Sequence, residues 1–363
     1  MIPPDRHKRL DIMAALLFAS AMLLACGVAA VRNCHPRCRC EVETFGLFDS
    51  FSLTKVDCSG AGPDAAPVPI PLDTSFLDLS SNSIRSINDA MLTGPGYTTL
   101  VSLDLSNNDI SQVGANAFSK LRYLETLDLS ANELESLSET SFVGLPLVEV
   151  DLSHNRFQQF SLDLFTTKGQ EKPLTVDLSS NLLTAVTRNP QGPPLSIKSL
   201  LLADNRLRTV PKLSGLPLRF LSLDGNQIST IKAGDFQELR DLSYLSLSGL
   251  GPLSHIQPGS FRGLENLQVL DLSNNGELKA LSPEVFGGLA SLQELNLSHS
   301  GLARLPGDVL KHLPSIRSIA LGPKMRCWRT RRQGQFHRQM GQAKSDDVIT
   351  CDGPGIVSHQ PAA

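Results

Sequence analysis

One repeated pattern runs through most of this chain of 363 residues, and it restricts the possible folds more than any other feature. The pattern is Leu-x-x-Leu-x-Leu-x-x-Asn, and its last position recurs at intervals of 21 to 26 residues. Eleven consecutive matches and a total of 60 leucines indicate a core built from one repeated packing unit. The last position falls at Asn82, Asn108, Asn132, Asn155, Asn181, Asn205, Asn226, Leu250, Asn275, Ser300 and Lys324.

Each repeat predicts a short strand followed by a turn. In Leu103-Asp104-Leu105 the side chains alternate, so the leucines enter the core and the aspartate faces solvent. The Asn follows where the chain turns, and its amide can bond backbone groups that would otherwise be buried unpaired. A second core ladder follows about ten residues after the Asn, and the coils at Asn181 and Asn205 lack it, so we expect irregular loops there. This ladder consists of Phe118, Phe142, Phe165, Phe236, Phe261 and Phe286.

Such repeats bury their apolar face only by stacking on one another. The sequence therefore predicts an α/β fold, a right-handed curved leucine-rich-repeat solenoid with a concave parallel β-sheet. With strands about 4.8 Å apart, eleven coils would span roughly 50 Å. Cysteine clusters stand where the ends need covering, so we expect disulfide-bonded caps. The expected division is an N-terminal cap at 31–72, repeats at 73–321 with the last running into the C-terminal cap, and that cap and tail at 322–363.

The first 30 residues have the character of a secretory signal peptide. A basic start at Arg6, Lys8 and Arg9 is followed by an uncharged apolar run that ends in small residues near Ala30. A signal anchor is the alternative, because the uncharged run is just long enough to span a bilayer. We favour cleavage near Ala30, no membrane insertion, and a mature chain in the extracellular space or matrix.

The cysteines fit this location. Cys26 would leave with the signal peptide, and six cysteines remain. In a secreted chain disulfides are favoured over a zinc site, and the sequence alone leaves three connectivities for the first four. The last two would close a long loop. The six are Cys34, Cys38, Cys40, Cys58, Cys327 and Cys351.

The outward strand positions are the expected partner-binding surface. Aspartates on successive strands form an acidic row, which either solvates the face or attracts basic partners. Phe220 and Tyr244 are predicted to be exposed side by side, and aromatic residues are frequent anchors in protein interfaces. The candidate residues are Phe76, Asp78, Asp104, Asp128, Glu149, Asp151, Asp177, Phe220 and Tyr244.

Two further surface features are candidate glycan sites. The segment from Lys324 to Lys344 has seven basic residues and no acidic one, so it is either a site for sulfated glycosaminoglycans or a solvated loop. Asn296 begins an Asn-Leu-Ser sequon and is a candidate glycosylation site, unless the sequon is unused. The glycan-binding candidates are Arg326, Arg329, Arg331, Arg332 and Arg338.

The sequence lacks the usual signs of catalysis or nucleic-acid binding. The eight histidines show no metal-ligand spacing, and there is no phosphate-binding glycine loop and no nucleophile elbow. The net charge is −3, with 41% hydrophobic and 19% charged residues, which fits neither a disordered chain nor a nucleic-acid binder. We expect a non-enzymatic protein without a cofactor.

At the level of motifs the chain resembles the small leucine-rich proteoglycans. The likeness rests on the spacing Cys34-x3-Cys38-x-Cys40-x17-Cys58, the repeats and the two-cysteine C-terminal cap. The stretches 40–60, 94–100 and 218–226 are similar, more specifically, to a secreted signalling regulator of that family. The resemblance implies the pairs Cys34–Cys40 and Cys38–Cys58.

The resemblance also implies a function. It points to stoichiometric capture of bone morphogenetic proteins and other transforming-growth-factor-β ligands, with chordin in a ternary complex. Fibroblast growth factors, Notch ligands and the Frizzled receptor ectodomain are further implied partners, with antagonism of Wnt signalling. One alternative is a structural matrix protein that organises collagen fibrils. Another is a recognition module for immune or neuronal adhesion, which would require membrane attachment.

Overall fold

The computed structural model describes residues 34–45, 51–62, 68–166, 172–302, 305, 309–322, 325–332 and 346–352. Of Phe45, Phe51 and the last two segments it describes only the backbone. The predicted signal peptide at 1–30 lies outside these residues.

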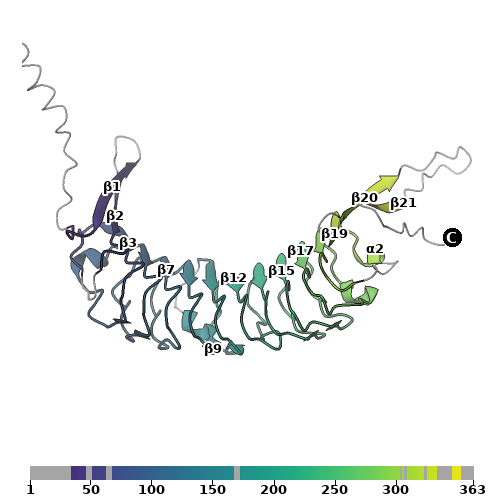
Figure 1. Cartoon of the computed structure of the whole chain (residues 1–363), viewed down its shortest axis with the longest axis horizontal. Coiled ribbons are helices and arrows are strands. Elements are labelled where there is room, and N and C mark those ends of the chain that lie inside the picture. Colours follow the sequence, from purple (N-terminus) through teal and green to yellow (C-terminus); the bar gives the residue numbers. More distant parts are fainter. Residues whose placement is uncertain are drawn as a thin grey trace, which may run out of the picture.

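The chain forms a curved solenoid whose strands line the concave side (Figure 1). Eleven parallel strands follow one another at the repeat interval, with leucine or another aliphatic residue buried at the centre of each. This confirms the solenoid and its concave parallel sheet. The repeat strands are β3 (Thr74–Asp78), β5 (Ser102–Asp104), β7 (Thr126–Asp128), β8 (Glu149–Asp151), β10 (Leu174–Asp177), β12 (Ile197–Leu201), β13 (Phe220–Ser222), β15 (Tyr244–Ser246), β17 (Val269–Asp271), β18 (Glu294–Asn296) and β19 (Ser318–Gly322).

The rest of each coil is made of turns and short elements. Three two-stranded sheets lie outside the concave sheet: β4 (Ser86–Ile87) with β6 (Gln112–Val113), β9 (Gln159–Ser161) with β11 (Ala185–Thr187), and β14 (Thr230–Ile231) with β16 (His255–Ile256). The described helices are short because a coil of this length has little room beyond its strand and turns. They are η2 (Pro95–Tyr97), η3 (Leu162–Phe165), η4 (Pro283–Phe286) and α2 (Val309–His312).

The ladder asparagines tie neighbouring coils together as predicted. The Nδ2 of Asn132 donates to the carbonyl oxygens of Leu105, Leu129 and Ser130, at 3.0 to 3.1 Å. Its Oδ1 accepts the N–H of Ile110 at 2.9 Å. Asn132 is 7% exposed, so without these bonds the backbone groups would be buried unpaired.

The phenylalanine ladder is buried and stacked on both sides of a gap. The ring centroids of Phe142 and Phe165 are 5.4 Å apart, and those of Phe236 and Phe261 are 5.8 Å apart. The gap coincides with the coils at Asn181 and Asn205, where the sequence has no phenylalanine at this position. Leucine and valine side chains fill the core there: Leu183, Val186, Leu195, Leu207, Val210 and Leu213.

Both ends of the sheet continue into antiparallel pairs. At the N-terminal end β1 (Arg39–Phe45) pairs with β2 (Phe51–Asp57), and β2 then joins β3 in parallel. At the other end β19 pairs with β20 (Met325–Arg332), which pairs with β21 (Asp346–Asp352). The caps therefore extend the sheet of the repeats, as Figure 1 shows for both ends.

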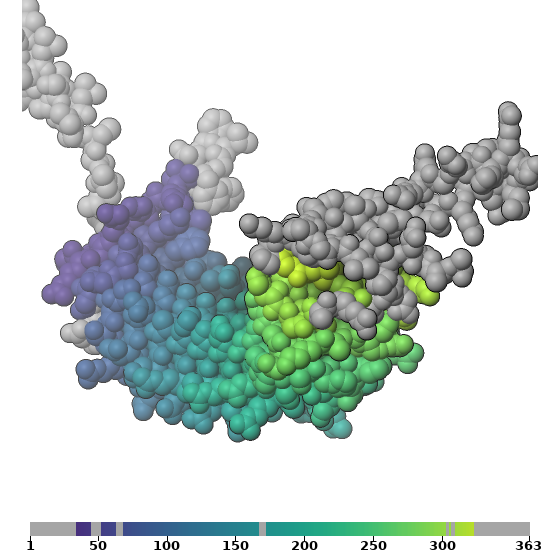
Figure 2. Space-filling model, turned by 45° about the vertical axis from the view of Figure 1, so that its right-hand side comes forward, coloured from purple at the N-terminus to yellow at the C-terminus, as the bar shows by residue number. Residues whose placement is uncertain are grey.

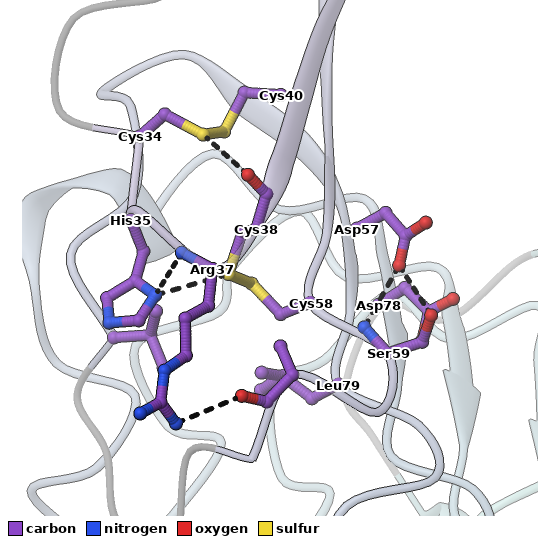
Figure 3. Close-up of a disulfide and its surroundings, with 12 residues drawn as sticks. Cys34, His35, Arg37, Cys38, Cys40, Asp57, Cys58, Ser59, Asp78 and Leu79 are labelled. Carbon is purple, nitrogen blue, oxygen red and sulfur yellow. Dashed lines mark hydrogen bonds between the residues drawn. A yellow bond between two sulfur atoms is a disulfide. The ribbon is translucent and has the colours of Figure 1, made fainter.

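Two disulfides close the N-terminal cap (Figure 3). Cys34 is bonded to Cys40, and Cys38 to Cys58, which confirms the pairing that the resemblance implies. Cys58 is fully buried and directly follows β2, so the second bridge fixes the cap to the strand that covers the first coil. At the other end, the backbone register places Cys327 opposite Cys351. Their side chains lie outside the described residues, and that bridge stays a prediction.

Candidate functional site

The predicted acidic row is present, and each carboxylate also has a structural role. The Oδ1 of Asp104 accepts the backbone N–H of Ser106 at 2.8 Å, which closes the turn after the strand. The same bond recurs along the row, so the Asp-Leu-Ser sequence of the repeat caps its own strand. Sequence analysis missed this role, although the two-residue spacing from Asp to Ser was visible. The other aspartates with this bond are Asp78, Asp128, Asp151, Asp177 and Asp271.

The row extends one strand further than predicted, into the N-terminal cap. Asp57 on β2 lies opposite Asp78 in the parallel register, and its Oδ1 accepts both the N–H and the hydroxyl of Ser59. The Asp-Cys-Ser sequence of the cap thus copies the Asp-Leu-Ser turn of the coils. These bonds, with the side-chain bond the larger, lower the pKa of Asp57.

The pKa shifts differ between the end and the middle of the row. Asp128 has neighbours in the row on both sides, and burial of its carboxyl raises its pKa. Bonds from Ser130 partly oppose the shift, whereas the charges of Asp151 and Asp104 add to it. The middle of the row therefore carries negative charge at some cost in free energy.

Farther along the wall the outward residues become apolar. Phe220 on β13 and Tyr244 on β15 are register partners, and their rings stack with centroids 4.7 Å apart and planes at 11°. The prediction placed both side by side, which is confirmed. It also described them as exposed, and this was wrong: both are half-buried because the stacked rings cover each other.

We define the central patch as Leu201, Phe220, Tyr244 and Val269, which are half-buried on β12, β13, β15 and β17. Negative charge lies on its C-terminal side. Burial raises the pKa of Tyr244, and the charges of Asp271, Asp224 and, more weakly, Glu294 add to the shift.

The acidic row is interrupted beside the central patch, and a different aspartate caps the turns there. Ser222 and Ser246 replace the row aspartates of β13 and β15. Asp224 accepts the hydroxyls of Ser222 and Ser246 at 3.0 and 2.6 Å, and the N–H of Ser248 at 2.7 Å. Sequence analysis missed Asp224, because it stands outside the row and acts on the next coil.

The remaining candidates lie away from this patch. Phe76 is on β3, roughly 30 Å along the sheet from Phe220, and the ammonium of Lys55 lies 5.5 Å from its ring centroid. Lys55 is also bonded to Glu43 at 2.7 Å, so Phe76 is engaged by the cap. Glu149 is exposed on β8. The predicted residues therefore form two groups, an acidic row and a central patch.

The sequon at Asn296 lies at the concave surface of β18. Asn296 is half-buried, and its Nδ2 donates to Asp271 Oδ2 at 3.0 Å. Its Oδ1 accepts the hydroxyl of Ser298 at 2.7 Å. Glycosylation of Asn296 stays a prediction, and a glycan there would lie two strands from Tyr244.

The C-terminal basic segment lies beside acidic residues from another part of the chain. Its hairpin places an aspartate opposite each of three arginines: Asp352 opposite Arg326, Asp347 opposite Arg331, and Asp346 opposite Arg332. Acidic residues thus stand beside a segment in which the sequence count found none. The side chains of Arg326, Arg329, Arg331 and Arg332, and all of Arg338, lie outside the described residues.

The space-filling view in Figure 2 shows the hollow between the two ends of the arc. Across the described segments, no His, Cys, Asp and Glu side chains gather in threes or more to hold a metal ion. Nor does any described helix have the length and apolar character needed to cross a bilayer.

The comparisons with known proteins agree with this architecture. The leucine rich repeat family matches residues 98–157, 251–302 and 276–322. Tsukushi of Danio rerio is 64% identical over 95% of this chain and 100% of its own length. Tsukushi of Gallus gallus and of Homo sapiens are each 54% identical, over 93% and 89% of this chain and 92% of their own lengths.

Two solved structures share the fold. One is the TLR13–ssRNA13 complex, with a TM-score of 0.52 and 24% identity over 78% of this chain and 47% of that one. The other is the Toll–Spatzle complex from Drosophila, with a TM-score of 0.59 and 22% identity over 69% and 33%. This chain spans about half and a third of the two neighbours, and at such identities the likeness establishes the fold alone.

Proposed function

The chain belongs to the Tsukushi family of leucine-rich-repeat proteins, and from this premise we propose that it is a secreted, non-enzymatic protein that captures extracellular signalling proteins on its concave sheet. Two features support secretion, namely the signal-like first 30 residues and the two cap disulfides, which persist in oxidising compartments. The proposed mechanism is stoichiometric: the bound ligand is withheld from its receptor, or a receptor ectodomain is occupied.

The observation that carries the proposal is the stacked pair of Phe220 and Tyr244. The pair stands on adjacent strands of a sheet that the coils already hold in place, so little ordering is needed on binding. Large aromatic side chains at the centre of a contact surface contribute strongly to protein interfaces. The carboxylates of Asp271 and Glu294 beside the pair favour a partner with basic groups next to its apolar contact.

The proposed partners are those that the family resemblance implies. They are bone morphogenetic proteins and other transforming-growth-factor-β ligands, chordin within a ternary complex, fibroblast growth factors, Notch ligands and the Frizzled ectodomain. The acidic row from Asp57 to Asp177 would add long-range attraction to basic partners. It would act on the association rate more than on the lifetime of the complex.

The test is a binding measurement with the mature chain, residues 31–363, against a bone morphogenetic protein and a Frizzled ectodomain. We expect Phe220→Ala and Tyr244→Ala each to weaken binding by about 2 kcal/mol, roughly thirtyfold. Phe76→Ala is the matched control, because it removes the same ring type from the same strand position, but on the first coil beside the cap. It should change affinity less than threefold.

The binding results distinguish this site from the alternatives. Loss of binding with Phe76→Ala, but not with Phe220→Ala, would move the site to the N-terminal coils. Binding to fibrillar collagen with none to either signalling protein would instead favour the structural matrix role. Circular dichroism of each variant checks that the coils remain folded.

A further inference from the structure

A group of basic side chains outside the concave sheet takes no part in the proposed partner site. Between residues 182 and 217 the sequence has five basic residues and one acidic residue, Asp204. Four of the five belong to the stretches that leave the concave sheet after Asn181 and Asn205. We call these four the basic flank: Arg188, Arg206, Arg208 and Lys212.

Backbone and side-chain contacts place the basic flank on two adjacent coils. The N–H of Arg206 donates to the carbonyl of Leu183 on the preceding coil at 2.9 Å. In the other direction, Arg188 Nη1 donates to the carbonyl of Ser214 at 2.6 Å, which brings the Arg188 guanidinium to the loop just after Lys212. The four charges therefore belong to one region of the surface.

The alternation of burial explains why three of these side chains, those of Arg206, Arg208 and Lys212, are exposed to solvent. Arg206 and Arg208 are exposed on either side of the buried Leu207. Val210 and Pro211 are buried next, and Lys212 is exposed again. The six steps from Arg206 to Lys212 span at most about 20 Å, so the three side chains lie on a strip no longer than that.

The neighbouring coils show what is unusual here. Arg156 occupies the same position in its coil as Arg206 does, directly after the ladder Asn, and forms an ion pair with Glu133 of the preceding coil. At the position that corresponds to Glu133, the coil before Arg206 has the uncharged residue Leu182. Among the described residues, Arg206, Arg208 and Lys212 form no ion pair.

The composition of the strip indicates the class of its ligand. The large apolar residues exposed in the described structure are Val42, Leu72, Tyr123 and Val143, and none belongs to these two coils. A folded protein partner would need an apolar anchor at the centre of the contact. A hydrated polyanion needs only regularly placed cations, and guanidinium groups bind oxyanions through paired hydrogen bonds.

We propose that the basic flank is a binding site for a sulfated polysaccharide such as heparan sulfate. The site is separate from the concave sheet and from the C-terminal arginines, whose hairpin already carries opposed aspartates. A chain bound there would leave the central patch free. The protein would therefore hold a matrix glycan and a signalling protein at the same time.

The experiment measures heparin affinity of the mature chain as a function of NaCl concentration. The test variant is Arg206→Ala/Arg208→Ala/Lys212→Ala. Polyanion binding weakens with salt in proportion to the number of ionic contacts, so the log–log slope should decrease by about three. The variant should also leave a heparin column at a clearly lower NaCl concentration.

Two control variants separate this site from the alternatives. Arg156→Ala removes a charge at the matching coil position that is already paired with Glu133, so the slope should stay unchanged. Arg206→Lys/Arg208→Lys keeps the charges and should preserve the slope while weakening affinity a few-fold, because lysine lacks the paired donors.

Three results would overturn the proposal. They are an unchanged slope in the triple alanine variant, an equal loss with Arg156→Ala, or a loss that appears only with Arg326→Ala/Arg329→Ala/Arg331→Ala. Equal binding of desulfated heparin or of an acidic protein would also reject the assignment to sulfated glycans. Because Arg156, Arg206, Arg208 and Lys212 are exposed, circular dichroism should be unchanged in the variants at these positions.

Discussion

The N-terminal coils and the central coils share one repeat but use its outward positions differently. From β3 to β10 each strand ends in an aspartate that caps its own turn, and the phenylalanine ladder below is continuous from Phe118 to Phe165. In the coils at Asn181 and Asn205 that ladder is interrupted. On β13 and β15, Ser222 and Ser246 replace the row aspartates, Asp224 caps the turn of another coil, and aromatic rings stack at the neighbouring outward position. The core positions stay constant while the outward positions vary, and the departures from the repeat mark both proposed sites.

The largest expected effect tests whether the ladder asparagines stabilise the N-terminal and the central coils equally. Asn132→Ala and Asn226→Ala each remove a buried amide that donates to three carbonyls and accepts one N–H. Each should lower the free energy of unfolding by about 3 kcal/mol, because the backbone carbonyls and N–H that lose these hydrogen bonds stay buried. Denaturant titration of both variants measures this. A difference much above 1 kcal/mol between the two losses would show that the asparagine bonds contribute unequally in the two regions.

A second prediction tests how tightly the central coils pack at Gly225. Gly225 and Gly249 occupy the same position in consecutive coils, with φ of 65° and 64°. Gly249→Ala should cost about 1 kcal/mol, the usual penalty for a left-handed backbone. Gly225→Ala should cost about 2 kcal/mol, because its Cβ would clash with Asp204 Oδ1.

The added cost of Gly225→Ala can be checked in an Asp204→Ala background. There the clash is absent, and the penalty should fall to that of Gly249→Ala. Thermal unfolding of the four variants gives the comparison. A Gly225→Ala penalty that persists without the Asp204 carboxylate would assign the strain to the backbone.

The smallest effect concerns the crowded charges of the N-terminal coils. The pKa of Asp128 is raised in the folded chain, so between the ordinary value of 3.8 and the raised one the unfolded chain binds fewer protons. Stability therefore falls as pH rises through this window, and the penalty is complete above it. Asp128→Asn keeps an oxygen for Ser130 and should make the protein slightly more stable at pH 7.

The gain from Asp128→Asn should disappear below pH 3.8, where the wild-type carboxyl is protonated in both states. Asp73→Asn, an exposed position outside the row, serves as the control and should change stability at neither pH. Denaturation midpoints at pH 3 and pH 7 measure the difference. A gain that is equal at both pH values would show that charge is not its cause.

The sequence by itself determined the solenoid, the asparagine and phenylalanine ladders, and the adjacency of Phe220 and Tyr244. Each depends on the repeat interval, because stacking identical coils fixes which residues become neighbours. Only the tertiary structure decided which neighbours engage each other. In the structure the ammonium of Lys55 lies over the ring of Phe76, and Asp57 continues the acidic row. Arg156 pairs with Glu133, whereas Arg206 has no such ion pair. These contacts depend on side-chain conformations and on cap segments outside the repeat, and the repeat interval constrains neither.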